Sequence, residues 1–297
     1  MPSLPPWDRV SVVLVTYNSR HVVASCLDQL ASARRLIIVD NASDDDTVDI
    51  IRRQRPDARV IVNPANYGYG TAANQGFAWV DTDYALSLNL DTLIADSVVS
   101  RLMAAMDADP HPGIVSPVLL NAKGRIDLAV MGPREHNHHP LGTMPEGDFC
   151  TWFVTGCAVL FRMSAWRAVG GFDERFFLYS EDLDLCLRMT RAGHGILVLG
   201  DVSAVHLGGQ SSRPSWRVRW RKDWHMTWGH LYIESKWGDA AVTRAQAWRL
   251  VGRHGLKALL YVLLARPRRM LGNLARAHAA AAFLRGRPAW RGRSATA

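Results

Sequence analysis

Two polar residues close a run of apolar residues and form the first group that could do chemistry. Residues 85–90 read as a buried strand, and Asn89 and Asp91 lie at its end. In an open α/β sheet, ligands bind beyond the carboxyl ends of the strands, where Asp91 would project. Carboxylate oxygens are the ligands that hard divalent cations prefer. His206 ends a second apolar run, and a lone histidine in such a place is more often structural.

A second acidic group, Glu181 and Asp182, begins a predicted helix over residues 181–191. Ser180 is a good N-cap for this helix, and Gly193 lies just beyond its end. Acidic residues in a first turn can simply complement the helix dipole. Two adjacent carboxylates also repel each other, which favours a binding partner or a chemical task for them.

The elements that must position these groups alternate between strand and helix. Strands are predicted over residues 10–16, 36–39, 59–62 and 153–161, and a helix follows the glycine-rich turn at Gly68. Short connections between alternating elements predict an α/β fold with a doubly wound, mostly parallel sheet. Each strand ends in polar residues, which is the pattern of a nucleotide site. The glycine fingerprint of dinucleotide-binding enzymes and the P-loop are both missing from the sequence, which disfavours a Rossmann dinucleotide enzyme.

Composition and charge set the broad class. The chain has 297 residues, of which 48% are hydrophobic and 21% charged, as in ordinary globular proteins. Its four cysteines suggest neither a disulfide framework nor a close metal-type pair, which favours a reducing cytosol. No secretory signal is visible, and the longest apolar run, residues 258–265, is too short to span a bilayer.

The charge of the chain is unevenly distributed. Residues 213–297 contain 18 Lys and Arg against 3 Asp and Glu, a local charge of +15, which leaves −7 for residues 1–212. A basic extension suggests a polyanionic partner, either an anionic membrane or nucleic acid. We expect three regions: a nucleotide-binding half over 1–120, a half over 121–212 that holds and activates a second substrate, and a basic, Trp-rich helical extension over 213–297.

Several motifs together resemble family 2 inverting glycosyltransferases of GT-A fold, and within them the bacterial cell-wall and O-antigen rhamnosyltransferases. The resemblance covers roughly residues 10–210. The matching stretches are Val15-Thr16-Tyr17-Asn18, Ile38-Val39-Asp40-Asn41-Ala42-Ser43-Asp44-Asp45, Asn66-Tyr67-Gly68-Tyr69-Gly70, Asn89-Leu90-Asp91, Gly170-Gly171-Phe172-Asp173-Glu174, Glu181-Asp182-Leu183-Asp184 and His206. Any one of them is weak, but their common order is specific.

The resemblance implies a nucleotide-sugar site. Asp40 would accept a hydrogen bond from the imide N–H of uracil or thymine. The competing interpretation of Asp40 is an N-cap for the next helix, a role that suits Ser43 better. The other residues expected around the donor are Thr16, Asn18, Asn41, Asn66, Gly68 and Asn89.

By the same resemblance, Asp91 and His206 would hold Mg²⁺ or Mn²⁺ against the donor diphosphate. The sequence departs from the common D-x-D pattern, because Asn89 replaces the first aspartate. Asp182 would be the general base, and Glu181 would orient the acceptor or a metal-bound water. We expect Asp184 and Arg188, four residues apart, to pair with each other instead.

The expected activity is therefore metal-dependent, inverting transfer of a sugar to a lipid-linked or cell-wall polysaccharide acceptor, with L-rhamnose from dTDP-rhamnose as the first candidate. Another donor, such as a UDP-hexose or UDP-galactofuranose, is the alternative for an enzyme. The non-enzymatic alternative is a nucleotide-binding scaffold without catalytic activity. The expected location is cytoplasmic, peripherally attached to the inner face of the plasma membrane.

The basic extension predicts helices over residues 244–266 and 268–285, broken at Pro267. Four tryptophans spaced by four residues, from Trp216 to Trp228, form one stripe. We expect this stripe to pack on the catalytic domain rather than lie in a membrane interface. Because no nucleic-acid motif accompanies the charge, we expect an anionic membrane and no nucleic-acid partner. The loop containing His136, His138 and His139 is predicted to face the acceptor rather than bind metal.

Overall fold

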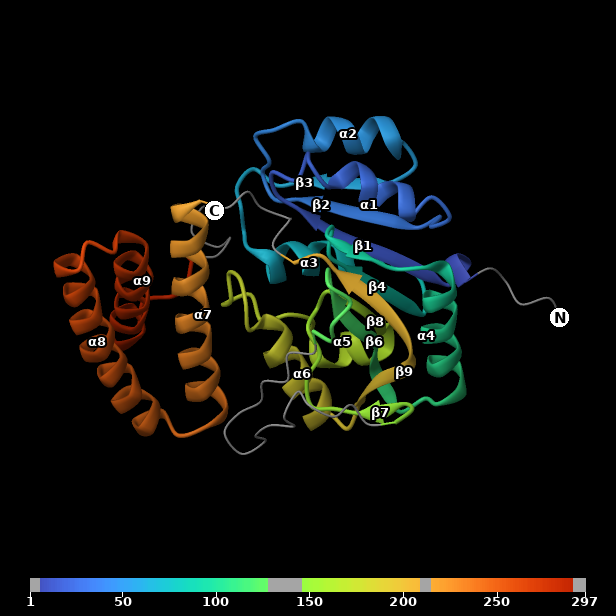
Figure 1. Cartoon of the computed structure of the whole chain (residues 1–297). Coiled ribbons are helices and arrows are strands. Elements are labelled where there is room, and N and C mark those ends of the chain that lie inside the picture. Colours follow the sequence, from blue (N-terminus) through green and yellow to red (C-terminus); the bar gives the residue numbers. More distant parts are fainter. Residues whose placement is uncertain (1–5, 128–145, 209–214, 291–297) are drawn as a thin grey trace. The chain divides into compact units, whose positions relative to one another are not determined.

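The computed structural model describes residues 6–127, 146–208 and 215–290 of the chain, and Figure 1 shows the elements coloured along the sequence. The histidine-containing loop lies outside these residues. The strands are β1 (Val10–Thr16), β2 (Leu36–Asp40), β3 (Arg59–Val62), β4 (Tyr84–Leu88), β5 (Thr92–Leu93), β6 (Pro112–Asn121), β7 (Phe149–Cys150), β8 (Ala158–Arg162) and β9 (Gly195–His206). The helices are η1 (Pro6–Asp8), α1 (Val23–Gln29), α2 (Thr47–Gln54), α3 (Tyr69–Phe77), α4 (Asp96–Ala108), α5 (Met163–Val169), α6 (Glu181–Arg191), α7 (Trp216–Trp237), α8 (Ala240–Leu263) and α9 (Pro267–Leu284).

These elements form two compact units. The sheet unit contains the described residues up to 127, then 146–172 and 182–208. The helical unit contains α7, α8 and α9 together with the segment Asp173–Glu181, which interrupts the sheet unit in sequence. The predicted start of the basic extension at residue 213 lies outside the described residues and stays a prediction. The proposed division of the preceding residues into donor and acceptor halves near residue 120 stays a prediction.

The sheet of the sheet unit is mixed, with the order β3-β2-β1-β4-β8-β6-β9-β5, and β7 pairs with β9. Strands β3, β2, β1 and β4 are parallel, as the strand–helix alternation predicts. Strand β8 then inserts antiparallel between β4 and β6. The sequence predicted a strand over 153–161, but only its last part is β8; residues 153–157 form a loop that approaches the end of β4. The α/β fold class is confirmed.

Alternating side chains of the strands bury two faces of the sheet. On one face Val12 and Leu14 of β1 join a core with residues of α1 and α4. On the other face α3 lies close to the sheet, because a Cβ on Gly76 would come within 2.7 Å of Val13 Cγ1 and 3.2 Å of Val39 Cγ2. A stacked ring pair between Phe77 and Trp166 joins α3 to α5, with ring centroids 3.8 Å apart.

The helical unit has a small core of its own. Leu231 of α7, Ala247 of α8 and Ala280 of α9 are fully buried against one another. Pro267 is at the first position of α9, where its missing N–H needs no partner, so the predicted break between the last two helices is confirmed. In the described part of the chain, no helix is both long and apolar enough to cross a bilayer.

The tryptophan stripe of α7 packs, as expected, but the partners that the structure describes belong to the helical unit itself. Trp224 Nε1 donates to His278 Nδ1 of α9 at 2.8 Å, and Trp228 Nε1 donates to the carbonyl of Arg287 at 3.0 Å. Trp216, at the start of the stripe, is 61% exposed. The expected partner was therefore wrong in part, because amphipathic spacing shows which face of a helix is buried and not what covers it.

Candidate active site

The strand that ends at Leu88 leads into a tight turn that presents Asp91. The amide of Thr92 donates to the carbonyl of Asn89 at 3.0 Å, which closes the turn. Thr92 then pairs with His206 in the β5–β9 ladder, and the amide of Leu207 donates to the carbonyl of Asp91 at 2.8 Å. This backbone pairing joins two side chains that lie 115 positions apart in the sequence. His206 Nε2 and Asp91 Oδ1 are 3.6 Å apart, and Asp91 is buried.

Two further side chains surround His206, and sequence reasoning missed both. Asp127 Oδ2 lies 3.8 Å from His206 Nδ1, so a carboxylate faces each ring nitrogen. Hydrogen bonding to Asp91 and to Cys157 raises the pKa of His206 to about 10, against the opposing effect of burial. A carboxylate on the second nitrogen is the usual way to orient a metal-binding imidazole. No local sequence pattern marks either residue, because both approach His206 through contacts between segments far apart in the chain.

The donor atoms at this position fit a cation that shares its coordination with a substrate. Within residues 6–127, 146–208 and 215–290, no group of three or more His, Cys, Asp or Glu side chains could hold a metal ion. Asp91 and His206 therefore supply one oxygen and one nitrogen, and phosphate oxygens and water would have to complete the shell. Mg²⁺ and Mn²⁺ are commonly bound in this way, through one or two carboxylates and substrate phosphates.

The ends of β1 and β2 bring Thr16 and Asp40 together, since the two residues are partners in the parallel ladder. Thr16 Oγ1 donates to Asp40 Oδ1 at 2.7 Å. Ser43 donates twice to the same carboxylate, through its amide to Oδ2 at 2.8 Å and through its hydroxyl to Oδ1 at 2.6 Å. Asp40 is fully buried, so its carboxylate anchors the turn that follows β2. Oδ2 accepts only the Ser43 amide among these bonds, and a carboxylate oxygen can accept more than one donor.

Three of the four asparagines predicted at the donor site shape the loops around Asp40. Asn18 takes a left-handed φ of 51°, and its side-chain oxygen accepts from the amide of Asp44 at 2.9 Å. Asn41 donates to the carbonyl of Gly68 at 2.9 Å and accepts from the amide of Tyr67 at 3.1 Å.

Asn66 completes this loop by accepting from the amide of Gly68 at 2.9 Å. Gly68 has a φ of 83° directly before α3, a conformation that glycine adopts without a steric penalty. Asn41 is buried and bonded on both sides of its amide, so in this structure it holds the loop together. The structure thus places Thr16, Asn18, Asp40, Asn41, Asn66 and Gly68 in one connected network.

The predicted base, Asp182, lies in the first turn of α6. Its Oδ1 accepts from the amide of Leu183 at 2.9 Å, and its Oδ2 accepts a long bond from the amide of Gly156 at 3.4 Å. Desolvation raises the pKa of Asp182, although these two backbone donors oppose the shift. The residue as a whole is only partly buried, whereas its carboxylate is desolvated enough to raise the pKa. Glu181 is buried and belongs to the helical unit, one residue before the boundary.

The dipeptide Gly156–Cys157 connects the base to the Asp91 turn. Gly156 donates to Asp182, and the next residue, Cys157, accepts from the amide of Asn89 at 2.9 Å. Asn89 Nδ2 also contacts Cys157 Sγ at 3.4 Å. Two adjacent residues of one loop therefore contact the predicted base on one side and the turn that presents Asp91 on the other. The loop 153–157, which the sequence predicted as strand, makes this connection.

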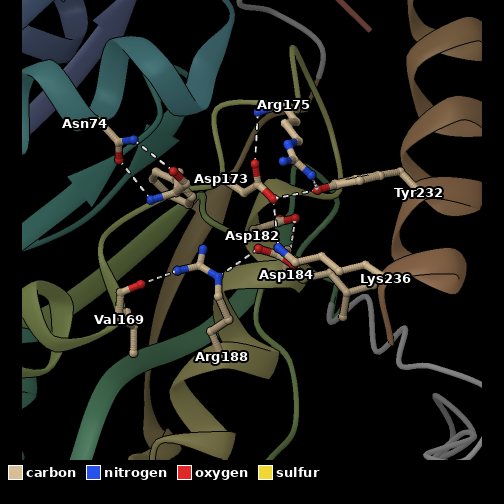
Figure 2. Close-up of polar contacts among 11 residues, drawn as sticks. Asn74, Val169, Asp173, Arg175, Asp182, Asp184, Arg188, Tyr232 and Lys236 are labelled. Carbon is tan, nitrogen blue, oxygen red and sulfur yellow. Dashed lines mark hydrogen bonds and ion pairs between the residues drawn. The ribbon is translucent and has the colours of Figure 1, made fainter. Parts of the chain in front are cut away.

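The remaining acidic residue of α6, Asp184, has a structural role, as predicted. Arg188 Nε donates to its Oδ2 at 2.8 Å, and Arg188 Nη1 donates to the carbonyl of Val169 at 2.7 Å (Figure 2). Asp184 is fully buried, and breaking a buried pair leaves an uncompensated charge. Ser180, predicted as the N-cap of α6, instead has a left-handed φ of 73°, outside the extended region usual for an N-cap.

Comparisons with known proteins identify the family of the chain. The sequence profile of the family described as "Glycosyl transferase family 2" matches residues 11–169. An N-acetylglucosaminyl-diphospho-decaprenol L-rhamnosyltransferase of Mycobacterium tuberculosis is 30% identical over 221 residues, which cover 63% of this chain and 72% of that protein. A low-salt glycan biosynthesis hexosyltransferase of Haloferax volcanii is 23% identical over 221 residues, covering 67% of each chain.

Solved structures of glycosyltransferases share the fold. A mannosyltransferase from Pyrobaculum calidifontis, in complex with GDP-Man and Mn²⁺, aligns with a TM-score of 0.58 at 19% identity, over 92% of this chain and 75% of that one. TarS residues 1–349 of S. aureus, in complex with UDP, align with a TM-score of 0.56 at 15% identity, over 94% and 92%. At these identities the alignments establish the fold and leave the donor open.

Proposed function

Because the chain belongs to glycosyl transferase family 2, an inverting family of glycosyltransferases, we propose that Asp91, His206 and Asp182 form the active site of a metal-dependent sugar transferase. The observation that carries the proposal is the Gly156–Cys157 connection, which joins Asp182 on one side to the Asp91 turn on the other. A base and a leaving-group site in fixed relation are what a one-step displacement requires.

The proposed donor is dTDP-L-rhamnose, and the proposed acceptor is a lipid-linked or cell-wall polysaccharide sugar. The mycobacterial relative, whose name states an N-acetylglucosaminyl-diphospho-decaprenol acceptor and L-rhamnose transfer, supports both assignments. Asp40 supports a pyrimidine base, since only an acceptor there can pair with an imide N–H. The network of Thr16, Ser43 and Asp40 would hold that acceptor in place. A UDP-hexose or UDP-galactofuranose is the alternative donor.

In the proposed reaction, a hydroxyl oxygen of the acceptor attacks the anomeric carbon while the bond from that carbon to the diphosphate oxygen breaks. Asp182 accepts the proton of the hydroxyl, and the nucleoside diphosphate leaves with the bonding electrons. A bound Mg²⁺ or Mn²⁺ would stabilise the charge on the leaving diphosphate. Asp91 and His206 would hold that ion, Asp127 would orient the imidazole, and the amides of Leu183 and Gly156 would keep the Asp182 carboxylate aimed.

The experiment that tests this function combines binding and turnover. Thermal-shift and calorimetric titrations compare dTDP-rhamnose, UDP-glucose, UDP-galactofuranose and GDP-mannose, each with Mn²⁺, Mg²⁺ or EDTA. Transfer is then measured to a short-chain N-acetylglucosaminyl-diphospho-prenol, and the anomeric configuration of the product is read by NMR. Metal-dependent binding without any transfer or donor hydrolysis would favour the non-catalytic scaffold. Equal stabilisation by GDP and by UDP or dTDP would contradict the role of Asp40.

We also propose that the helical unit attaches the enzyme peripherally to an anionic membrane on its cytoplasmic side. Residues 240–297 contain 12 Lys and Arg and no Asp or Glu, which complements an anionic surface. The end of α8 exposes a group of large apolar side chains, here named the α8 apolar face. Its members are Leu256, Leu259, Leu260, Val262, Leu263 and Leu264. Leu256 is 70% and Leu263 77% exposed, and shallow insertion of such a face beside cationic residues is the way interfacial helices bind.

A further inference from the structure

The nine residues before the predicted base belong to the helical unit and not to the sheet unit that surrounds them in sequence. This segment, Asp173–Glu181, is held mainly by α7. The residue that follows it is Asp182. Any constraint on the end of the segment is therefore transmitted through the backbone to the first turn of α6.

Asp173 anchors the beginning of the segment to α7. Its Oδ2 accepts from Lys236 Nζ at 2.7 Å and from the hydroxyl of Tyr232 at 3.0 Å, and its Oδ1 accepts from the amide of Arg175 at 3.0 Å (Figure 2). Burial opposes ionisation of this carboxyl, but these hydrogen bonds and the charge of Lys236 outweigh it and lower the pKa of Asp173. The anchor is thus an ionised, half-buried carboxylate with several donors, one of which is the ammonium group of Lys236.

Aromatic side chains and a backbone contact fix the middle of the segment. Phe176, 1% exposed, packs edge-on against Tyr232 with ring centroids 5.0 Å apart. Phe177 stacks on His225 of α7 at 4.8 Å. Trp290 Nε1 donates to the carbonyl of Glu174 at 2.7 Å.

The end of the segment has an unusual backbone. Tyr179 and Ser180 are consecutive residues other than glycine with left-handed φ values of 68° and 73°. Such conformations persist where the surrounding structure determines them. Here the close neighbour is Gly229 of α7: a Cβ at that position would lie 2.9 Å from Ser180 Oγ and 3.2 Å from both Ser180 Cβ and the carbonyl of Tyr179. The absence of a side chain on Gly229 therefore permits the turn that immediately precedes α6.

We propose that α7 positions the general base, with Asp173, Tyr232 and Lys236 holding one end of the segment and Gly229 accommodating the turn at the other. None of these residues touches the reacting atoms in the proposal; they are positioning residues that act through Asp182. The inference rests on the proposed function, in which Asp182 takes the proton. It gives the helical unit a part in catalysis that is separate from membrane attachment.

The test compares Gly229→Ala with Gly252→Ala, a matched change in α8 where a Cβ would meet nothing within 4 Å. Transfer from dTDP-rhamnose to the short-chain lipid acceptor is measured in detergent, beside wild type and Asp182→Asn. We expect Gly229→Ala to lower kcat tenfold or more while the donor Kd changes less than twofold, and Gly252→Ala to match wild type. Reduced thermal stability with an unchanged kcat would mean a merely structural contact and would overturn the proposal.

A second pair of variants tests the anchor. Lys236→Met should lower kcat severalfold, and Lys236→Arg should restore most of it, because an arginine can still donate to Asp173. Arg53→Met, at an exposed position of α2, is the control. Hydrogen exchange of the peptide over residues 173–183 gives a readout that needs no substrate. It should increase in Gly229→Ala and Lys236→Met and not in the controls, and unchanged exchange in both would overturn the proposal.

The design separates the two hypotheses. If wild type transfers sugar and Asp182→Asn does not, yet Gly229→Ala and Lys236→Met behave as wild type, then the positioning role is wrong and the proposed function stands. If Asp182→Asn keeps near-normal turnover, the proposed base is wrong. In that case the exchange data still decide whether α7 orders the segment.

Discussion

The two units of this protein use polar residues in opposite ways. In the sheet unit the polar side chains at the strand ends are buried and bonded to one another, as in the contacts of Asp40 with Thr16 and Ser43. In the helical unit most charge is at the surface, and residues 213–297 carry +15 against −7 for the rest of the chain. Buried polar networks fix geometry, whereas exposed charge of one sign attracts a partner at a distance.

The difference predicts how each unit responds to substitution. Substitution of a single polar residue at the proposed site in the sheet unit should change turnover or donor binding strongly, because no other side chain can take over its role. Surface changes in the helical unit should act gradually, because many cations share the same attraction. The segment Asp173–Glu181 is the exception, since it belongs to the helical unit, is bonded to α7 and leads directly to Asp182.

The largest expected effect comes from Asp182→Asn. An amide keeps the shape of the carboxylate but cannot accept the proton, so kcat should fall by about 10² to 10⁴ while donor binding remains. Calorimetry of donor binding and radiolabelled transfer give the two values. Asp201→Asn, which changes an exposed carboxylate of β9 paired with Arg101, is the control and should behave as wild type. Near-normal turnover of Asp182→Asn would move the base to Glu181 or Asp184.

The next effect concerns the proposed metal ligands. Asp91→Ala should weaken metal-dependent donor binding by about 100-fold or more, because an ion on the diphosphate contributes several kcal/mol. Asn89→Asp should be tolerated, since it adds a carboxylate next to the proposed ion and loses only the contact with Cys157 Sγ. Titrations with and without EDTA measure both. The exposed Asp96→Ala in α4 is the control, and a normal Mn²⁺ response in Asp91→Ala would place the metal elsewhere.

The surroundings of Asp182 and of the proposed metal ligands also show how much of the structure the sequence could predict. The parallel strands β1, β2, β3 and β4 follow from runs of β-branched and apolar residues, and α6 follows from its periodicity. The approach of His206 to Asp91 depends on the β5–β9 pairing, which no local pattern encodes. It was expected only because the motifs resemble a known family.

The misses have a common physical origin. Residues 153–157 are apolar enough to predict a strand, but they form a loop whose last two residues hydrogen-bond to Asn89 and Asp182. Asp127 and Cys157 reach His206 through tertiary contacts. The assignment of Asp173–Glu181 to the helical unit likewise depends on side chains of α7 about 60 residues later, such as Lys236. Long-range pairing of this kind leaves no periodic signal.

A third prediction concerns base recognition in the sheet unit. In Asp40→Asn one carboxylate oxygen becomes an NH₂ group, which cannot accept from Thr16 or Ser43. We expect a loss of about 1–3 kcal/mol in the free energy of unfolding, as for other unsatisfied buried groups. We also expect about tenfold weaker binding of UDP and dTDP sugars. Urea unfolding and the donor panel measure these, with the exposed Asp44→Asn as control. An unfolding loss with unchanged donor preference would leave Asp40 a purely structural residue.

A smaller and graded effect is expected for membrane attachment. Each Lys or Arg near an anionic surface contributes about 1 kcal/mol, and salt screens that attraction over about 10 Å at 0.1 M. The protein should therefore co-sediment with phosphatidylglycerol-containing vesicles at low salt and be largely released at high salt.

Leu263→Glu in the α8 apolar face should weaken this vesicle binding about tenfold, whereas Val62→Glu, at a 47% exposed position of β3, should not change it. Point variants are preferable to truncation after Trp237, because α7 buries Leu231 against α8 and α9. Sedimentation equilibrium tests the rival occupant of the face: a dimer that Leu263→Glu dissociates, without vesicle binding, would make it a contact between copies. Tight binding of single-stranded nucleic acid without vesicle binding would also contradict the proposal.

The smallest effect is a shift along the pH axis, and it separates the two units in one experiment. Desolvation raises the pKa of Asp182, so the base is lost by protonation at a pH above the value near 4 of an ordinary aspartate. The pKa of Asp173 is lowered instead, so the stability from its pairing with Lys236 is present above the unfolded pKa and is lost only as the pH falls through the lower folded value. Between these two pKa values kcat should fall reversibly while near-UV circular dichroism, dominated by buried aromatic residues, stays constant. An acid limb that coincides with loss of the dichroism signal would show that unfolding, and not protonation of Asp182, stops the reaction.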